Sequence, residues 1–151
     1  MEIKKLIPDN VEEYISYLKT ALHEEPEMMT TDEVNEDEIR KNVNKDIFKR
    51  STSLLAYENG EIAGRIEYHF YGCIQDGYKM AYVNWVYVRK KFRKQGIAKQ
   101  LFAEFEKDCI NHDIDQYFLL RAENESAEHF YRSFEGAELG NSPILRKNIQ
   151  L

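Results

Sequence analysis

The segment from Met80 to Asn111 constrains the fold most strongly, because its hydrophobic period changes once. Residues 80–88, MAYVNWVYV, are too continuously apolar for a half-exposed strand and predict a central, buried strand. After a basic loop, a helix is predicted from near Gly96 to near Asn111 by an apolar stripe of Ile97, Ala98, Leu101, Phe102, Phe105 and Cys109. Residues 117–120, YFLL, predict a second buried strand. The order of strand, helix and strand implies a parallel pair with a right-handed crossover.

The first half of the chain predicts a strand, two helices and a hairpin. A short strand is expected within residues 1–7, and a capping box of Asp9 and Glu12 is expected to open a helix with apolar positions at Val11, Tyr14, Ile15, Leu18 and Leu22. A second helix is marked by Ile39, Val43 and Ile47. The loop between them, residues 24–38, holds eight carboxylates and no Lys or Arg. Asn59-Gly60 predicts a hairpin turn, and Asp76-Gly77 predicts another.

The last part of the chain predicts a helix and closing strands. Asn124 is expected to cap a helix whose apolar face holds Ala127, Phe130, Tyr131 and Phe134, and Gly136-Ala137 is expected to end it. Residues through Ile144-Leu145 and Ile149 predict one or two closing strands. Their edges could pair two copies of the chain into a homodimer. The whole chain therefore predicts a mixed α/β fold.

Composition favours one globular domain over residues 1–151. Hydrophobic residues make up 42% of the 151 positions and aromatic residues 13%, enough for one core. The net charge of -6 argues against nucleic acid and membrane as partners. No signal peptide precedes Pro8, and two cysteines give no disulfide framework, so a cytoplasmic location is expected. No metal is expected, because the Cys and His spacing matches no ligand set.

The loop before the predicted helix is the most informative segment for function. Residues 89–94, RKKFRK, contain five of the chain's 21 Lys and Arg residues and no acid. The rest of the chain therefore has a formal net charge of 16 minus 27, or -11. Gly96 permits close approach of a ligand, and a helix N-terminus offers free N–H groups. These features predict an anion site of the pyrophosphate type. The segment matches neither a Walker A loop nor a dinucleotide GxGxxG motif.

Two motifs in register resemble the GNAT N-acetyltransferase superfamily. Arg93-x-x-Gly96-x-Ala98 is similar to the acetyl-CoA signature of that family, and residues 124–131, NESAEHFY, resemble its second motif. The resemblance implies a central mixed β-sheet flanked by about four helices. It also implies acetyl-CoA as the cosubstrate, and transfer of the acetyl group to a primary amine by direct attack in a ternary complex.

The resemblance assigns roles to named residues. The pyrophosphate is expected on backbone N–H groups of the loop made by Arg93, Lys94, Gln95, Gly96, Ile97 and Ala98. The pantetheine arm is expected to pair with Val86, Tyr87 and Val88 as an added strand. Asn124 is expected to cap its helix and to contact the arm. Tyr131 occupies the position of the tyrosine that protonates the departing thiolate.

Two of these assignments have structural alternatives. Tyr131 could instead be one more core aromatic beside Phe130 and Phe134. The general base is open, because Asn84 cannot accept a proton; Glu67 and His69 are candidates, although residues on such a strand more often face solvent. Cys109 continues the helical stripe and is expected in the core.

The acidic loop suggests the chemistry of the acceptor. The resemblance implies that this loop borders the acceptor side of the cleft, where its eight carboxylates would attract a small cationic amine, although such charge runs usually serve only solvation. Alternative functions are an acyl-CoA-binding sensor with weak catalysis and a protein N-acetyltransferase. A single-stranded nucleic-acid site on Tyr87, Phe92 and the basic loop is a third alternative, disfavoured by the acidic surroundings.

Overall fold

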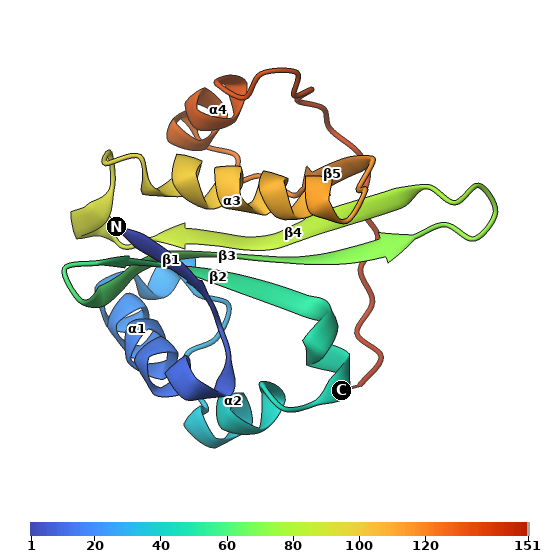
Figure 1. Ribbon diagram of the computed structural model, residues 1–151. Coiled ribbons are helices and arrows are strands. Elements are labelled where there is room, and N and C mark those ends of the chain that lie inside the picture. The colour runs from blue at the N-terminus through green and yellow to red at the C-terminus, as the bar shows by residue number, and fades with distance from the viewer. Residues whose placement is uncertain (151) are drawn as a thin grey trace. The chain divides into compact units, whose positions relative to one another are not determined.

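The computed structural model describes residues 1–150, which form two compact units, residues 1–119 and residues 120–150. The first unit contains a five-stranded sheet of β1 (Glu2–Lys5), β2 (Ser51–Glu58), β3 (Glu61–Gly72), β4 (Lys79–Val88) and β5 (Gln116–Leu119), in that spatial order (Figure 1). All neighbours are antiparallel except β4 and β5, which are parallel. The predicted parallel pair is confirmed.

Helices cover both faces of this sheet. α1 (Val11–Glu24) and α2 (Glu36–Asn42) lie on one face, and α3 (Ile97–Asn111) lies on the other (Figure 1). Short 3-10 turns are η1 (Pro8–Asn10), η2 (Pro26–Met28), η3 (Asp46–Arg50) and η4 (Lys90–Phe92). The mixed α/β class predicted from the sequence is confirmed.

Side-chain alternation along β3 divides the core into two layers. Ile66 and Tyr68 are fully buried, and the Tyr68 ring lies 4.5 Å from that of Phe105 on α3. On the opposite face, Arg65 and its neighbours point toward α1, where Tyr14 and Tyr17 pack against β4. The layer under α3 is therefore apolar, whereas the layer under α1 contains polar groups.

The second unit contains α4 (Glu125–Arg132). Asn124 caps it as expected, because its Oδ1 accepts a hydrogen bond of 2.8 Å from the Ala127 N–H. The rings of Phe130, Tyr131 and Phe134 contact one another at centroid distances of 5.0–5.6 Å. In residues 1–150, no helix has the length and apolar character that a membrane span requires.

Three strand predictions were wrong. β4 is the fourth strand in the sheet and not the central one, and only Ala81, Val83 and Tyr87 on it are buried. β5 is the edge strand of the first unit, so Phe118 is 44% exposed. No strand forms in residues 120–150, because the sequence ILRKNI places its apolar residues at no strand period and leaves them exposed. The closing-strand edges proposed for a homodimer are therefore absent from the described residues.

Two helix predictions also need correction. The Asp9–Glu12 capping box does not form: Asn10 is the residue before α1, and its side chain accepts a hydrogen bond from the Ile7 N–H and donates one to the Lys5 carbonyl, so it caps no N–H of the helix. The second helix ends at Asn42, and Ile47 lies in η3 with 73% exposure. Ile47 has no apolar layer to pack against, so the helical period does not continue through it.

Candidate active site

The loop between β4 and α3 presents free backbone donors. Gly96 adopts φ +79°, in the left-handed region that favours glycine, and caps α3. The first hydrogen bond of the helix runs from the Gln100 N–H to the Gly96 carbonyl at 3.1 Å. Within residues 1–150, the N–H groups of Ile97, Ala98 and Lys99 therefore have no backbone acceptor. A helix of 15 residues adds the positive end of its dipole at this point.

The space around Gly96 is open. A Cβ atom built on this residue would meet no other heavy atom within 4 Å. Glycine is therefore required here by its backbone conformation and not by a close protein neighbour. The open volume in front of the helix N-terminus fits the expected anion site.

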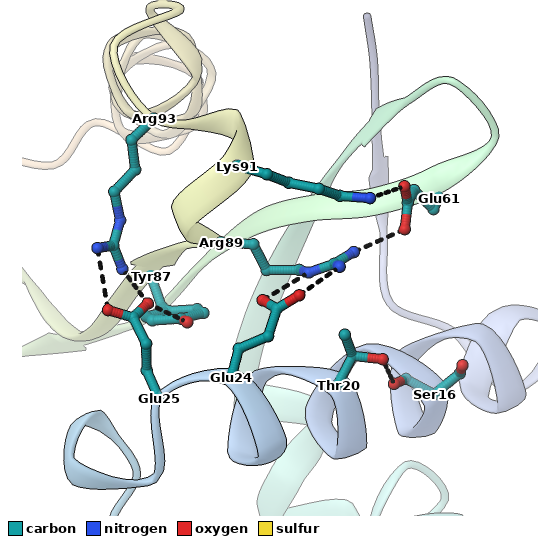
Figure 2. Close-up of polar contacts among 9 residues, drawn as sticks. All are labelled: Ser16, Thr20, Glu24, Glu25, Glu61, Tyr87, Arg89, Lys91 and Arg93. Atoms are coloured by element: carbon teal, nitrogen blue, oxygen red, sulfur yellow. Dashed lines mark hydrogen bonds and ion pairs between the residues drawn. The ribbon is translucent and has the colours of Figure 1, made fainter.

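Most of the positive charge in the basic loop is neutralised by carboxylates (Figure 2). The Arg89 side chain is 6% exposed and bonds Glu24 at 2.8 Å and Glu61 at 2.7 Å. Lys91 also pairs with Glu61, and Arg93 pairs with Glu25. The expected concentration of free positive charge is thus reduced to Lys90 and Lys94, which have no ion pair within residues 1–150.

These ion pairs connect the end of α1 to the basic loop. Arg93 Nη1 lies 3.1 Å from Glu25 Oε1, its Nε donates to the Val88 carbonyl at 2.8 Å, and the Tyr87 hydroxyl donates to Glu25 at 2.6 Å. Burial and the Glu25 hydrogen bond raise the pKa of Tyr87. The contacts fix the Arg93 side chain against β4. No local pattern predicted the contacts with Glu25, because the partners are 62 to 68 residues apart in the sequence.

The pKa values of the carboxylates in this cluster follow from the same contacts. Hydrogen bonding by Arg89 holds the pKa of Glu24 below its ordinary value. Hydrogen bonding by Lys91 and Arg89 does the same for Glu61. All the carboxylates that bind the loop are therefore ionised at neutral pH, which is consistent with their role as structural anchors.

β4 leaves one edge free where the loop begins. Glu67 pairs with Trp85 and Tyr68 pairs with Val83, so Asn84 is an extra residue that forms a β-bulge. The ladder with β5 ends at Val83 and Leu119. Residues 84–88 therefore pair with β3 alone among the strands of the first unit. An extended arm can add to this edge beside Val86, Tyr87 and Val88.

The bulge also brings polar side chains together. Glu67 accepts hydrogen bonds from Ser53 Oγ at 2.8 Å, Arg65 Nη1 at 3.0 Å and Asn84 Nδ2 at 2.6 Å. Burial alone would raise the pKa of Glu67, but the Arg65 charge and the bonds from Asn84 and Ser53 outweigh it and lower the pKa. Glu67 is thus an ionised, half-buried carboxylate and not the solvent-facing residue expected by the alternative interpretation.

His69 lies at the far end of this polar row. Its Nδ1 is 3.3 Å from Ser51 Oγ, and its ring lies 5.6 Å from that of Tyr82. Glu67 and His69 share the sheet face that also carries α1, as the alternation predicted. Only Glu67 contacts the bulge.

A cavity of about 280 Å³ opens between α1, α2 and the sheet. Its walls are mostly apolar, and Arg65 and Trp85 from the sheet line it. Thr30, Thr31, Glu33, Asn35 and Glu38 add polar groups from the acidic loop and α2. Sequence reasoning missed Arg65 and Trp85 as site residues. A signal for Arg65 was present in the alternation along residues 61–72, which places it on the same face as Glu67 and His69.

The remaining predicted site residues lie in the second unit. Asn124 caps α4, and Tyr131 lies on that helix between Phe130 and Phe134. Burial raises the pKa of the Tyr131 hydroxyl, so this phenol stays protonated at neutral pH. Its role as a proton donor stays a prediction.

The cysteines and possible metal ligands add no chemistry to this site. Cys109 is buried in the core as expected, and burial raises its pKa to about 12. Cys73 is exposed. Within residues 1–150, no three His, Cys, Asp or Glu side chains are grouped to hold a metal ion.

The fold and this site define an acyltransferase of the class that the two motifs resemble. A sheet with a bulged fourth strand leads through a glycine turn into a helix with free N–H groups. The family model described as the acetyltransferase (GNAT) family matches residues 14–135. The chain therefore belongs to the GNAT family, and the expected N-acetyltransferase activity is the activity of that family.

Solved structures share the fold at low sequence identity. An aminoglycoside acetyltransferase from an uncultured soil metagenomic sample, in complex with trehalose, is similar with a TM-score of 0.81 at 16% identity, over 99% of this chain and 96% of that one. A ribosomal-protein-alanine N-acetyltransferase from Brucella melitensis biovar Abortus 2308 gives 0.73 at 17% identity, over 97% and 100%. No curated protein matches the chain.

Proposed function

We propose that the protein is an acetyl-CoA-dependent N-acetyltransferase that acts on the primary amine of a small cationic molecule by direct attack in a ternary complex. The observation that carries this proposal is the free edge of β4 leading into the glycine turn and open N-terminus of α3. Backbone donors and an open strand edge suit a pyrophosphate with an extended arm. Acetyl-CoA supplies the activated acetyl thioester.

The chain's own residues would hold the cosubstrate mainly by backbone groups. The N–H groups of residues 94–98 and of Lys99 face the anion, and Lys90 and Lys94 add the charge that is not already paired. Val86, Tyr87 and Val88 offer the strand edge. Arg93 would position the loop and not bind the anion directly, because its side chain already binds Glu25 and the Val88 carbonyl.

Two side chains are proposed to move protons. The Tyr131 hydroxyl, kept neutral by its raised pKa, donates a proton to the departing thiolate. Glu67 receives the proton of the amine, whose nitrogen becomes far more acidic as the new C–N bond forms. The low pKa of Glu67 makes it a weak base, so the reacting amine must lose its first proton to solvent.

The cationic acceptor is supported by part of the acidic loop only. Glu24 and Glu25 bind Arg89 and Arg93, so they contribute little free field. Glu27, Asp32 and Glu33 have no ion pair within the described residues 1–150, and Glu33 lines the cavity. Attraction of a cation is therefore assigned to these three residues.

Release of free CoA from acetyl-CoA in the presence of an amine panel tests the function. The panel contains polyamines, aminoglycosides, amino acids and their amides, and N-terminal peptides. We expect release with at least one small cationic amine. Binding of acetyl-CoA without release by any amine would indicate the acyl-CoA sensor, and release with peptides alone would indicate a protein N-acetyltransferase.

A further inference from the structure

We propose that the cavity between α1, α2 and the sheet selects an α-amino carbonyl compound with an apolar side chain. In this arrangement the carbonyl-type oxygen binds Arg65, the amine lies beside Glu67, and the apolar side chain fills the cavity. The proposal rests on the proposed function only for the reaction that follows binding. It names an acceptor class that the family membership does not specify.

Arg65 is a buried cation with an unused hydrogen-bonding edge. The residue is 8% exposed, and its guanidinium lies 5.2 Å from the Tyr14 ring centre and 5.7 Å from that of Trp85. Both of its hydrogen bonds, to Tyr14 Oη and Glu67 Oε2, use the single nitrogen Nη1. The buried Nε has no hydrogen-bond acceptor within residues 1–150, and none of the Arg65 hydrogen bonds there uses Nη2.

An unused guanidinium edge at a cavity indicates a ligand oxygen. A buried N–H without an acceptor costs about 1–3 kcal/mol, which a ligand oxygen would recover. The Nε and Nη2 donors are parallel and suit a planar carbonyl, amide or carboxylate group. A ligand without an oxygen at this point would leave the edge unpaired.

Glu67 places a carboxylate beside the same guanidinium, on its Nη1 side. Its Oε2 lies 3.0 Å from Arg65 Nη1. A nitrogen and an oxygen on adjacent carbon atoms are separated by roughly 3 Å, as covalent geometry requires. We therefore assign the oxygen of an α-amino carbonyl unit to Arg65 and its amine to the neighbouring Glu67.

The rest of the cavity suits an apolar side chain. Leu18, Leu22, Met29, Ile39 and Trp85 line it. Its volume of about 280 Å³ is at the lower limit of small-molecule sites, which range over roughly 300–1,000 Å³. A phenylalanine-sized side chain fits such a volume, whereas a whole aminoglycoside exceeds it.

Trp85 is the only tryptophan in the chain and lines the cavity, so its fluorescence reports occupancy. The protein is titrated without acetyl-CoA with phenylalaninamide, phenylalanine, phenethylamine, which lacks the oxygen, and glycinamide, which lacks the side chain. We expect phenylalaninamide or phenylalanine to bind at least 10-fold more tightly than both truncated ligands. The order of the first two identifies an amide or a carboxylate as the preferred group.

Equal affinity for phenethylamine and phenylalaninamide, or no fluorescence change with any ligand, would overturn the proposal. Because acetyl-CoA is absent, this result is independent of the CoA-release assay. An active acetyltransferase without this preference would disprove the inference and leave the proposed function intact. A protein that binds with this preference but releases no CoA would support the inference and disprove the proposed function.

Two variants and one control identify the residues. Arg65→Lys keeps the positive charge beside Glu67 but removes the second donor edge, so the affinity ratio of phenylalaninamide to phenethylamine should fall to about 1. Leu22→Phe fills the cavity and should weaken phenylalaninamide by at least 10-fold while sparing glycinamide. Arg132→Lys changes an exposed arginine that does not line this cavity and should have no effect.

The two variants change different parts of the cavity, so if one fails to fold, the other still tests the proposal. Thermal melting of each variant confirms that it is folded before titration. An unchanged ligand ratio in folded Arg65→Lys, or unchanged phenylalaninamide affinity in folded Leu22→Phe, would each contradict the proposal.

Discussion

Replacing Gly96 by aspartate should abolish acetyl-CoA binding while leaving the protein folded. The residue has φ +79°, so any other residue pays a conformational cost of about 1 kcal/mol. No heavy atom lies within 4 Å of a Cβ at this position, so no steric clash within the protein is added. The melting temperature should therefore fall by only a few degrees.

The loss of affinity comes from charge at the helix N-terminus. Two unit charges 4 Å apart repel by about 4 kcal/mol at an effective dielectric constant of 20. The aspartate carboxylate would also compete for the free N–H groups of Ile97, Ala98 and Lys99. Affinity for acetyl-CoA, measured by titration calorimetry, should fall on the order of 10²-fold or more, and CoA should behave in the same way.

Gly96→Ala is the matched control. Alanine carries at least as large a conformational cost as aspartate in the left-handed region and no charge, and its acetyl-CoA affinity should fall by less than about 10-fold. If the folded aspartate and alanine variants bind acetyl-CoA equally, the pyrophosphate does not lie at this helix N-terminus and the reasoning is refuted.

Three further predictions concern catalysis, stability and acceptor attraction. Tyr131→Phe should keep its melting temperature and acetyl-CoA affinity but lose on the order of 10²-fold in turnover. A turnover equal to that of the wild type would show that Tyr131 is only a core aromatic. Glu24→Gln should lower the free energy of unfolding by about 1–2 kcal/mol at pH 7, measured by urea denaturation, because Arg89 loses a partner. The lowered pKa values of Glu24 and Glu61 stabilise the fold above the unfolded carboxylate pKa, so stability should fall as pH drops below about 4.5, and less steeply in Glu24→Gln. Glu33→Gln should raise the Michaelis constant for a cationic acceptor at low salt and spare that for acetyl-CoA; equal constants for the two proteins would exclude steering by this residue.

Local sequence signals predicted the elements that present the site. The apolar stripe after Gly96 predicted α3 to within one residue at its start, because a helical face is a local feature of the sequence. Asn59-Gly60 predicted the β2–β3 turn, where both residues have positive φ. Asn124 predicted the cap of α4 for the same reason.

The charge of the basic loop was not predictable from the loop alone. Arg89 and Glu24 are 65 residues apart, and their contact depends on how α1 packs against the sheet. A run of five cations therefore indicated a positive patch that the fold largely neutralises. The negative charge of the acidic loop is also partly neutralised, because Glu24 pairs with Arg89 and Glu25 pairs with Arg93.

The acceptor side of the site depends on a bulge. Asn84 interrupts an apolar strand, and this residue turns Trp85 and itself toward the same face of the sheet. Strict alternation puts adjacent residues on opposite faces of a sheet, so it cannot predict that Asn84 and Trp85 lie on the same face. Arg65 lies two residues before Glu67 and Trp85 pairs with Glu67, so alternation places both on this face, and Asn84 is the residue that the bulge adds to it.

Amide hydrogen exchange with and without acetyl-CoA tests the central claim most directly. If the cosubstrate binds the free edge of β4 and the N-terminus of α3, peptides covering residues 85–99 should gain protection, while those from β1 and the β2–β3 hairpin should exchange unchanged. Protection confined to other segments, or no protection at saturating acetyl-CoA, would contradict the assignment of the site.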